Sequence, residues 1–235
     1  MINEKTLTKE EKGILFSLCL GDGYIAKPKT KNGNAQFDCT HSIKQLEYLT
    51  WKRDLIFKIL GGNKPPKIGF KTIHLKANDS NYEACRFCKV HSYFTFLRKL
   101  LYNGSVKELS KEALEMLTPQ GLAIWFMDDG WGFNLRNRKK EITNRMEIGI
   151  ATDSFSKEEN ELIIQTIKEK FGIKFRLGRK LSTSTHKLLW QIRTNSQCEV
   201  QKFFELVSPY IIDSMKYKIT SKIAKIHECD TSEIG

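Results

Sequence analysis

The chain has 235 residues, 40% of them hydrophobic and 11% aromatic, which is enough to bury a core without disulfides. Its 39 lysines and arginines outnumber 27 acidic residues and give a net charge of +12. This composition excludes a disordered tail and favours a polyanionic partner, with nucleic acid ahead of an anionic membrane, although charge alone also fits a merely soluble basic protein. No apolar run approaches the ~18 residues that span a bilayer, and the first residues lack a signal-peptide layout. We therefore expect an intracellular protein without a membrane role, in an organelle (mitochondrion or chloroplast) or a microbial cytoplasm.

The first predicted element is a helix that begins at a capping box, residues 8–11 (Thr-Lys-Glu-Glu). It continues through an apolar run to Leu20 and stops at Gly21-Asp22-Gly23. The run is apolar nearly all round, and Gly13, Ser17 and Gly21 form a ridge of small residues at i, i+4 and i+8. Such a ridge lets a second helix approach closely.

A hairpin is expected next, with Asn32-Gly33 as its turn and three lysines on its loop, namely Lys27, Lys29 and Lys31. His41 then precedes an amphipathic helix whose core-facing residues include Leu46, Leu49 and Ile56, ending at Leu60-Gly61. Further strands and a helix containing Phe96-Leu97 complete this half. Cys85 and Cys88 fall in one such strand, where residues three apart face opposite sides, so we interpret them as packing residues and not as zinc ligands.

The second half repeats this order. Thr118 is the expected N-cap of an apolar helix with Pro119 at its first position, and the helix ends in Asp128-Asp129-Gly130. A hairpin follows, with basic residues on its loop that include Arg136, Arg138 and Lys139. Asp153 then precedes a helix ending at Phe171-Gly172, and strands and a helix with Phe203-Phe204 close the chain.

Matching spacings support an internal repeat. The separation of Asp22 from His41 resembles that of Asp129 from Asp153, and the separation of His41 from Gly61 resembles that of Asp153 from Gly172. We therefore predict an α+β fold of two similar αββαββα units, residues 1–112 and 113–235, joined by a polar stretch.

The chemically unusual feature is a carboxylate at the C-terminal end of each apolar helix, where the helix dipole disfavours negative charge. A single Asp-Gly helix end is ordinary, but two copies at matching places indicate a site. If the helices pack side by side, Asp22 and Asp129 approach each other, and a divalent cation would relieve the repulsion. Carboxylates, terminal carbonyls and substrate phosphates around such a cation are the arrangement used for phosphodiester hydrolysis.

A strand near the end of the chain has two different faces. Lys187, Leu189, Gln191 and Arg193 give one largely polar and basic face, while Leu188, Trp190 and Ile192 are expected to point toward the core. The first face and the basic hairpin loops are candidate contacts for DNA bases and phosphates.

Residues 15–23 (Leu-Phe-Ser-Leu-Cys-Leu-Gly-Asp-Gly) and 122–130 (Leu-Ala-Ile-Trp-Phe-Met-Asp-Asp-Gly) resemble the two motifs of single-chain LAGLIDADG homing endonucleases. The resemblance covers nearly the whole chain and implies central motif helices and antiparallel sheets that bind the DNA major groove. It implies a Mg²⁺ (or Mn²⁺) site at Asp22 and Asp129, with Gly21 and Asp128 beside them. The resemblance also implies that Lys218 and Lys107 assist the attacking water or stabilise charge. Near Lys107 the sequence departs from the family pattern, because Ser110 replaces the proline usual after that lysine. His41 and Asp153 stand where the family often has glutamine, so they are candidates for positioning water.

The implied activity is intron- or intein-type homing. A monomer would bind double-stranded DNA at a long asymmetric site and cut both strands across the minor groove, leaving 3′ overhangs. An RNA maturase that binds its host intron RNA, and a catalytically inactive DNA-binding protein, are the alternatives. Both alternative functions tolerate loss of the motif aspartates, so the retention of Asp22 and Asp129 favours a nuclease.

Overall fold

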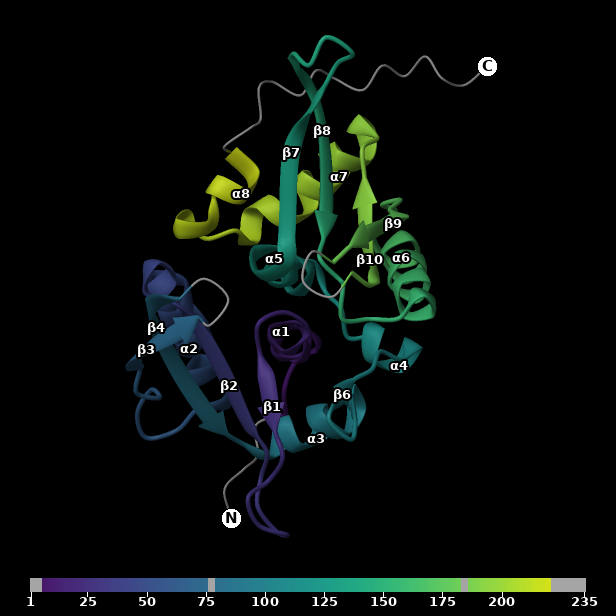
Figure 1. Cartoon of the computed structure of the whole chain (residues 1–235). Helices are drawn as coiled ribbons and strands as arrows, with labels where there is room; N and C mark the ends of the chain where they lie inside the picture. The colour runs from purple at the N-terminus through teal and green to yellow at the C-terminus, as the bar shows by residue number, and fades with distance from the viewer. Residues whose placement is uncertain (1–5, 76–78, 183–185, 221–235) are drawn as a thin grey trace. The chain divides into compact units, whose positions relative to one another are not determined.

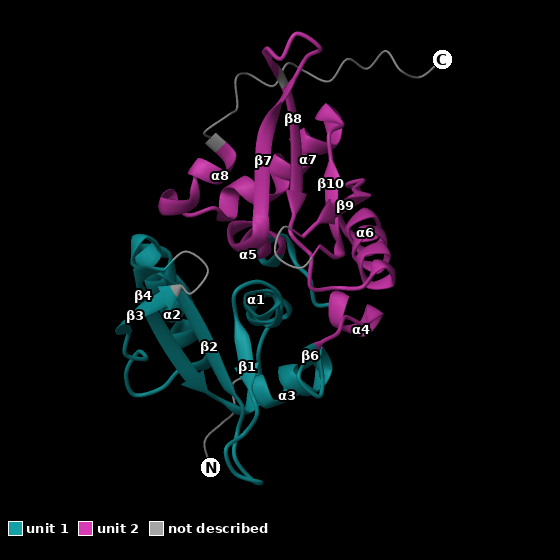
Figure 2. Ribbon diagram, viewed as in Figure 1, with its two compact units in different colours: residues 1–106, 116–121 teal, residues 107–115, 122–235 magenta. Residues whose placement is uncertain are grey.

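The computed structural model describes residues 6–75, 79–182 and 186–220, which form two compact units (Figure 1). Figure 2 colours the units: the first comprises residues up to 106 together with 116–121, and the second comprises 107–115 and the chain from 122 onward. The boundary expected between residues 112 and 113 therefore lies where the chain alternates between the units. Within the described residues, no helix is long and apolar enough to cross a membrane.

The first unit has the predicted order of elements. They are α1 (Lys9–Leu20), β1 (Tyr24–Ala26), β2 (Gln36–Ser42), the 3₁₀ turn η1 (Ile43–Gln45), α2 (Leu46–Leu60), β3 (Gly69–Leu75), β4 (Ser80–Val90) and α3 (Ser92–Leu101). The short strands β5 (Tyr102–Asn103) and β6 (Val106–Lys107) follow as a hairpin that the sequence did not predict.

Local sequence rules fix the ends of these elements. The capping box at Thr8 forms as predicted, with Glu11 N–H donating to the Thr8 hydroxyl at 3.2 Å and Thr8 N–H donating to the Glu11 carboxylate at 2.8 Å. Gly61, with φ 69°, ends α2. The β1–β2 hairpin is confirmed, but its loop is longer than a two-residue turn: Gly33 N–H donates to the Thr30 carbonyl at 3.0 Å, so Asn32-Gly33 are the last two positions of the turn.

The sheet of the first unit is antiparallel with the order β1-β2-β4-β3. Along β2, Phe37, Cys39 and His41 are buried, and the residues between them are partly exposed. Helices α2 and α3 pack against this sheet, so one face is core and the other is polar. Cys85 is buried and Cys88 exposed, so the prediction that both are packing residues is wrong for Cys88, which faces the opposite side of the strand from Cys85.

The second unit repeats the plan. Its elements are α4 (Lys111–Leu114), α5 (Pro119–Asp129, of which the start belongs to the first unit), β7 (Gly130–Arg136), β8 (Ile142–Ile150), α6 (Lys157–Phe171), β9 (Arg176–Leu181), β10 (Leu188–Thr194), α7 (Gln197–Val207), the 3₁₀ turns η2 (Ser208–Tyr210) and η3 (Asp213–Met215), and α8 (Tyr217–Thr220). The order α5-β7-β8-α6-β9-β10-α7 confirms the predicted αββαββα repeat.

The second sheet is also antiparallel, with the order β7-β8-β10-β9. Ile148, Ile150 and Ile192 are fully buried on the face against which α6 and α7 pack. The other face, called the polar face of the second sheet below, carries the side chains that alternate with these, including Glu147 and Arg193. Gly172, in a left-handed conformation, ends α6 as predicted.

Residues 116–121 pack within the first unit against the ridge of small residues on α1. The Thr118 hydroxyl donates to the Glu10 carboxylate at 2.9 Å and accepts from Gly121 N–H at 3.1 Å, which makes Thr118 the predicted N-cap. A Cβ on Gly13 would lie 2.7 Å from the Met116 carbonyl oxygen, and one on Gly121 would contact the Ser17 hydroxyl. The absence of side chains at Gly13 and Gly121 therefore permits this close packing.

Candidate functional site

The first candidate group lies at the end of α1. Gly21 N–H donates to the Ser17 carbonyl at 3.5 Å and ends the helix, and Asp22 follows with a side chain that is 40% exposed. The Asp22 carboxylate lines an open pocket of about 460 Å³ together with residues on the polar face of the first sheet. The pocket residues are Asp22, Tyr24, Ala26, Gln36, Asp38, Thr40, Lys71 and Arg86.

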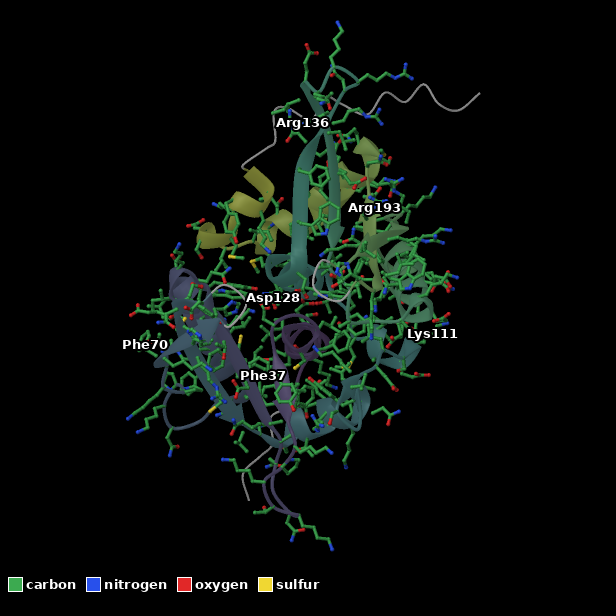
Figure 3. All side chains as sticks on the ribbon, viewed as in Figure 1. Phe37, Phe70, Lys111, Asp128, Arg136 and Arg193 are labelled. Carbon is green, nitrogen blue, oxygen red and sulfur yellow. The ribbon has the colours of Figure 1, made fainter. Side chains whose placement is uncertain are left out.

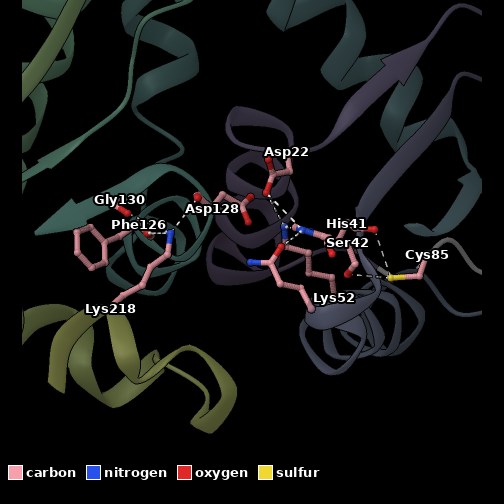
Figure 4. Close-up of polar contacts among 10 residues, drawn as sticks. Asp22, His41, Ser42, Lys52, Cys85, Phe126, Asp128, Gly130 and Lys218 are labelled. Carbon is pink, nitrogen blue, oxygen red and sulfur yellow. Dashed lines mark hydrogen bonds and ion pairs between the residues drawn. The ribbon is translucent and has the colours of Figure 1, made fainter. Parts of the chain in front are cut away.

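Two nitrogen groups of the first unit approach this carboxylate (Figure 4). His41 Nδ1 lies 3.7 Å and Lys52 Nζ 3.9 Å from Asp22 Oδ2. Lys52 Nζ is also 3.1 Å from His41 Nε2, and an ammonium can only donate, so Nε2 accepts and the proton is on Nδ1. His41 Nδ1 in turn lies 3.1 Å from Gln45 Oε1. The histidine is thereby held in one tautomer with its N–H toward Gln45 and Asp22.

Lys52 is a residue that the sequence analysis missed. Its side chain is fully buried, and its ammonium lies 4.4 Å from the centroid of the Tyr48 ring. Burial of a charge is costly unless it is paired, and here Asp22, His41 and Tyr48 surround it. The available signal was its place on α2 in the same stripe as Leu49 and Ile56, where a lysine is out of place unless it has a partner.

The second candidate group lies at the end of α5 and uses different partners. Trp125 Nε1–H donates to Asp129 Oδ2 at 3.2 Å. Lys218, in α8, donates to the main-chain carbonyls of Phe126 at 3.4 Å, Asp128 at 2.9 Å and Gly130 at 3.1 Å (Figure 4). A cation here satisfies carbonyls that the helix leaves without internal partners and faces the negative end of the helix dipole. The structure therefore brings Lys218 to the second motif, as the resemblance implied.

The remaining predicted residues around the motifs lie in defined places. Lys107 is the last residue of β6 and belongs to the second unit, so its assignment to the first motif stays a prediction. Asp153 Oδ2 accepts from Lys180 Nζ at 3.2 Å, and its Oδ1 is buried and has no hydrogen-bond partner among the residues that the structure describes. Ala151 N–H donates to the Asp129 carbonyl at 2.9 Å, so the segment that leads to Asp153 is hydrogen-bonded to the end of the second motif.

The predicted basic loops lie at hairpin tips. Lys27, Lys29 and Lys31 are exposed on the β1–β2 loop. Arg136, Arg138 and Lys139 are exposed at the tip of the β7–β8 hairpin, where Figure 3 labels Arg136. These positions suit phosphate contacts, because exposed cations on projecting loops reach a backbone without entering a groove.

The two faces of β10 are only partly as predicted. Ile192 is buried, while the side chain of Arg193 is 33% exposed on the polar face, and Lys187 is exposed. The prediction that Leu188 faces the core is wrong, because Leu188 is 50% exposed opposite Leu181, which is 61% exposed. Gln191 is 9% exposed, more covered than expected for a groove residue.

Comparison with known proteins assigns the family. The sequence model of the LAGLIDADG DNA endonuclease family matches residues 12–200. The chain belongs to this family. A solved structure of the homing endonuclease I-WcaI bound to its DNA recognition sequence is 26% identical, with a TM-score of 0.69 over 91% of this chain and 87% of that one. The chain has the LAGLIDADG homing endonuclease fold.

Curated relatives have several names. The probable intron-encoded endonuclease 1 of Wickerhamomyces canadensis is 28% identical over 91% of this chain and 85% of its own length. A protein named RecA from Mycolicibacterium flavescens is 25% identical over 91% of this chain, and this chain spans about half of it, 47%. The cytochrome b mRNA maturase bI2 of Saccharomyces cerevisiae is 28% identical, and 46% of it is covered.

Proposed function

We propose that this LAGLIDADG family member is a site-specific DNA endonuclease that makes a metal-dependent double-strand break. The observation that carries the proposal is that an aspartate stands just after α1 and another at the last position of α5, each with a basic side chain of its own unit at that helix end. Lys52 and His41 lie at Asp22, and Lys218 lies on the carbonyls that precede and follow Asp129. The similarity to a homing endonuclease bound to its recognition sequence supports duplex DNA as the substrate.

A divalent cation fits the donors at these helix ends. Asp22 offers a half-exposed carboxylate on an open pocket, and hard cations such as Mg²⁺ and Mn²⁺ prefer carboxylate, carbonyl and phosphate oxygens. Asp22 in the first unit and Asp129 in the second would each be a metal ligand, with Gly21 and Asp128 as additional oxygen donors. The cation supplies Lewis-acid activation of water and of the scissile phosphate. The chain's own contribution is to orient the aspartates and to place ammonium groups where negative charge develops.

We further propose that one copy of the chain binds a long asymmetric site and cuts across the minor groove to leave 3′ overhangs. The two polar faces differ in their side chains, so the two halves of the site should differ in sequence. Because two motifs lie in one chain, no two-fold symmetric DNA is required.

The decisive experiment is incubation with a library of random duplexes, with and without Mg²⁺, followed by sequencing of the cut ends. We expect metal-dependent cleavage at one non-palindromic sequence with 3′ extensions. Sedimentation on the selected duplex should give one protein per site. No cleavage under any divalent metal, or two proteins on a symmetric site, would contradict the proposal.

A second candidate is an RNA maturase, favoured by the similarity to the maturase bI2. The intron RNA would compete with duplex DNA for binding to the basic hairpin tips. Competition between structured intron RNA and the selected duplex tests this candidate, and binding of the RNA by a variant that no longer cuts DNA would support a second role.

A further inference from the structure

A buried carboxylate lies on the polar face of the second sheet. Glu147, in β8, is 6% exposed. Its Oε2 accepts from Arg176 Nη2 at 2.8 Å and its Oε1 accepts from Arg193 Nη1 at 3.2 Å. Arg176 of β9 and Arg193 of β10 lie directly opposite each other in the sheet. One carboxylate therefore holds two arginines that come from two neighbouring strands.

The arginines keep donors beyond those that Glu147 uses. Each guanidinium has five N–H groups, and each gives one nitrogen to the carboxylate. The Arg176 side chain is 51% exposed and that of Arg193 33% exposed. Arg193 Nε is buried beside Gly178, so it is not the donor for a ligand, and the N–H groups at the ends of the two guanidinium groups that Glu147 does not use remain. A cluster with a surplus positive charge and further N–H donors is suited to bind an acceptor.

Gly178 allows Arg193 to adopt this position. A Cβ on Gly178 would lie 2.7 Å from Arg193 Nε and 3.0 Å from its Cδ, so the arginine lies across the strand where a side chain is missing. Glu147 fixes the end of the guanidinium and Gly178 makes room for its stem. The rotamer freedom that an arginine normally loses on binding is therefore already lost in the protein.

We propose that Glu147 holds Arg176 and Arg193 as a preformed site for guanine in the DNA half bound by the second unit; this inference rests on the proposed endonuclease function. Guanine presents O6 and N7 as paired acceptors in the major groove, and arginine is their commonest specific partner. Glu147 is a positioning residue, since both of its oxygens are occupied by arginine.

Neighbouring aromatic residues favour base contact over phosphate contact. Phe133 lies opposite Glu147 in the β7–β8 pair and is 42% exposed. Its ring stacks on Trp131, with centroids 5.4 Å apart and an interplanar angle of 11°. An apolar surface beside the arginines suits base edges and thymine methyl groups, whereas phosphates are better matched by the lysines of the hairpin tips.

The test measures base preference by selecting bound duplexes in Ca²⁺, where binding is scored without reference to cutting. We expect guanine at one or two positions of the half-site. Arg193→Met should lower the preference for guanine there by roughly 5- to 150-fold. Replacement of that guanine with 7-deazaguanine should weaken binding by the wild-type chain and leave binding by Arg193→Met unchanged. Glu147→Gln should lower the same preference by a smaller factor while the rest of the profile is unchanged.

A matched control lies in the first unit, where Asp38 accepts two contacts from a single arginine, Arg86. Asp38→Asn should leave the preference at the second unit's positions unchanged. Circular dichroism of each variant shows whether it is folded. Arg193→Lys keeps the positive charge, so a loss of guanine preference in this folded variant is a loss of recognition. Uniformly weaker binding with an unchanged base profile would mean phosphate contact and overturn this inference. Failure of the wild-type chain to select or cut any duplex would instead overturn the proposed function.

Discussion

At the end of α1 the cationic group faces a carboxylate side chain, whereas at the end of α5 it faces main-chain carbonyl oxygens. Lys52 is buried and lies 3.9 Å from Asp22, and Lys218 is half-buried and donates to three carbonyls around Asp129. Both arrangements oppose the negative potential of a helix C-terminus. The first stabilises charge on the Asp22 side chain itself, and in the second Lys218 lies on the main chain while an indole N–H donates to the Asp129 carboxylate.

The polar faces of the two sheets also differ, in how many arginines one carboxylate binds. Asp38 takes both contacts from Arg86, and this hydrogen bonding raises the pKa of the Arg86 guanidinium, while Glu147 divides its oxygens between Arg176 and Arg193. The same repeat thus supports two chemically different halves. The consequence is that equivalent substitutions in the two units should have unequal effects.

The largest effect is expected from the motif aspartates. Asp22→Asn and Asp129→Asn should each lower the rate of double-strand cleavage by about three orders of magnitude or more, because a metal ligand contributes several kcal/mol to the transition state. Binding to the selected duplex, measured by fluorescence anisotropy, should change little. Robust double-strand cutting by either variant would remove the aspartates from the site.

Lys218→Met should have the next largest effect. It removes the donor from three carbonyls at the end of α5, and loss of one preorganised electrostatic group costs about 100-fold in rate. Single-turnover cleavage at saturating Mg²⁺ measures this. Lys216→Met is the control, since Lys216 is exposed and pairs with Asp213 at 2.6 Å. Equal rates for both variants would show that Lys218 serves only to cap the helix.

The two lysines considered for the first half can be separated by metal affinity. Lys52→Met should slow cleavage by about tenfold and also tighten metal binding, because a positive charge 3.9 Å from Asp22 opposes a cation. Lys107→Met should slow cleavage without changing metal affinity. Titration of Mn²⁺ into a complex with a nuclease-resistant duplex measures the affinity, with exposed Lys58→Met as the control on α2. Unchanged Mn²⁺ binding in Lys52→Met would contradict this electrostatic role.

The sequence predicted the fold well because its signals are local. The capping box at Thr8, the glycines that end α2 and α6, and the recurrence of the apolar motif helices each act over a few residues. These signals were sufficient for the order αββαββα in both halves. The ridge of small residues at Gly13 and Ser17 also indicated that another segment packs closely on α1, but the spacing did not show that the chain alternates between the units before residue 122.

The site was predicted less completely, for a similar reason. Asp22 and Asp129 follow from the motifs, and Lys218 from the resemblance. Spacing along α2 could have shown that Lys52 is buried, but not that Asp22 and His41 are its partners. The pair of arginines on Glu147 depends on which strands are neighbours, which single-sequence spacing does not give. The exposed end of β10 at Leu188 also depends on tertiary structure, because strand alternation alone does not say where the covering helices stop.

The smallest effect is expected from Trp125, which is fully buried and tests whether Asp129 is held by its indole. Trp125→Phe keeps an aromatic ring in the core and removes the N–H that donates to Asp129 at 3.2 Å. A hydrogen bond to a charged group contributes about 1.5–3 kcal/mol when buried, and Asp129 is partly exposed, so we expect a rate loss of only about 3- to 10-fold. A double-mutant cycle with Asp129→Asn decides the cause. If the indole acts through the carboxylate, Trp125→Phe should cause no further loss of rate in the Asp129→Asn background, measured on single-strand nicking. An undiminished further loss would mean that the substitution acts through packing of α5 and not through Asp129.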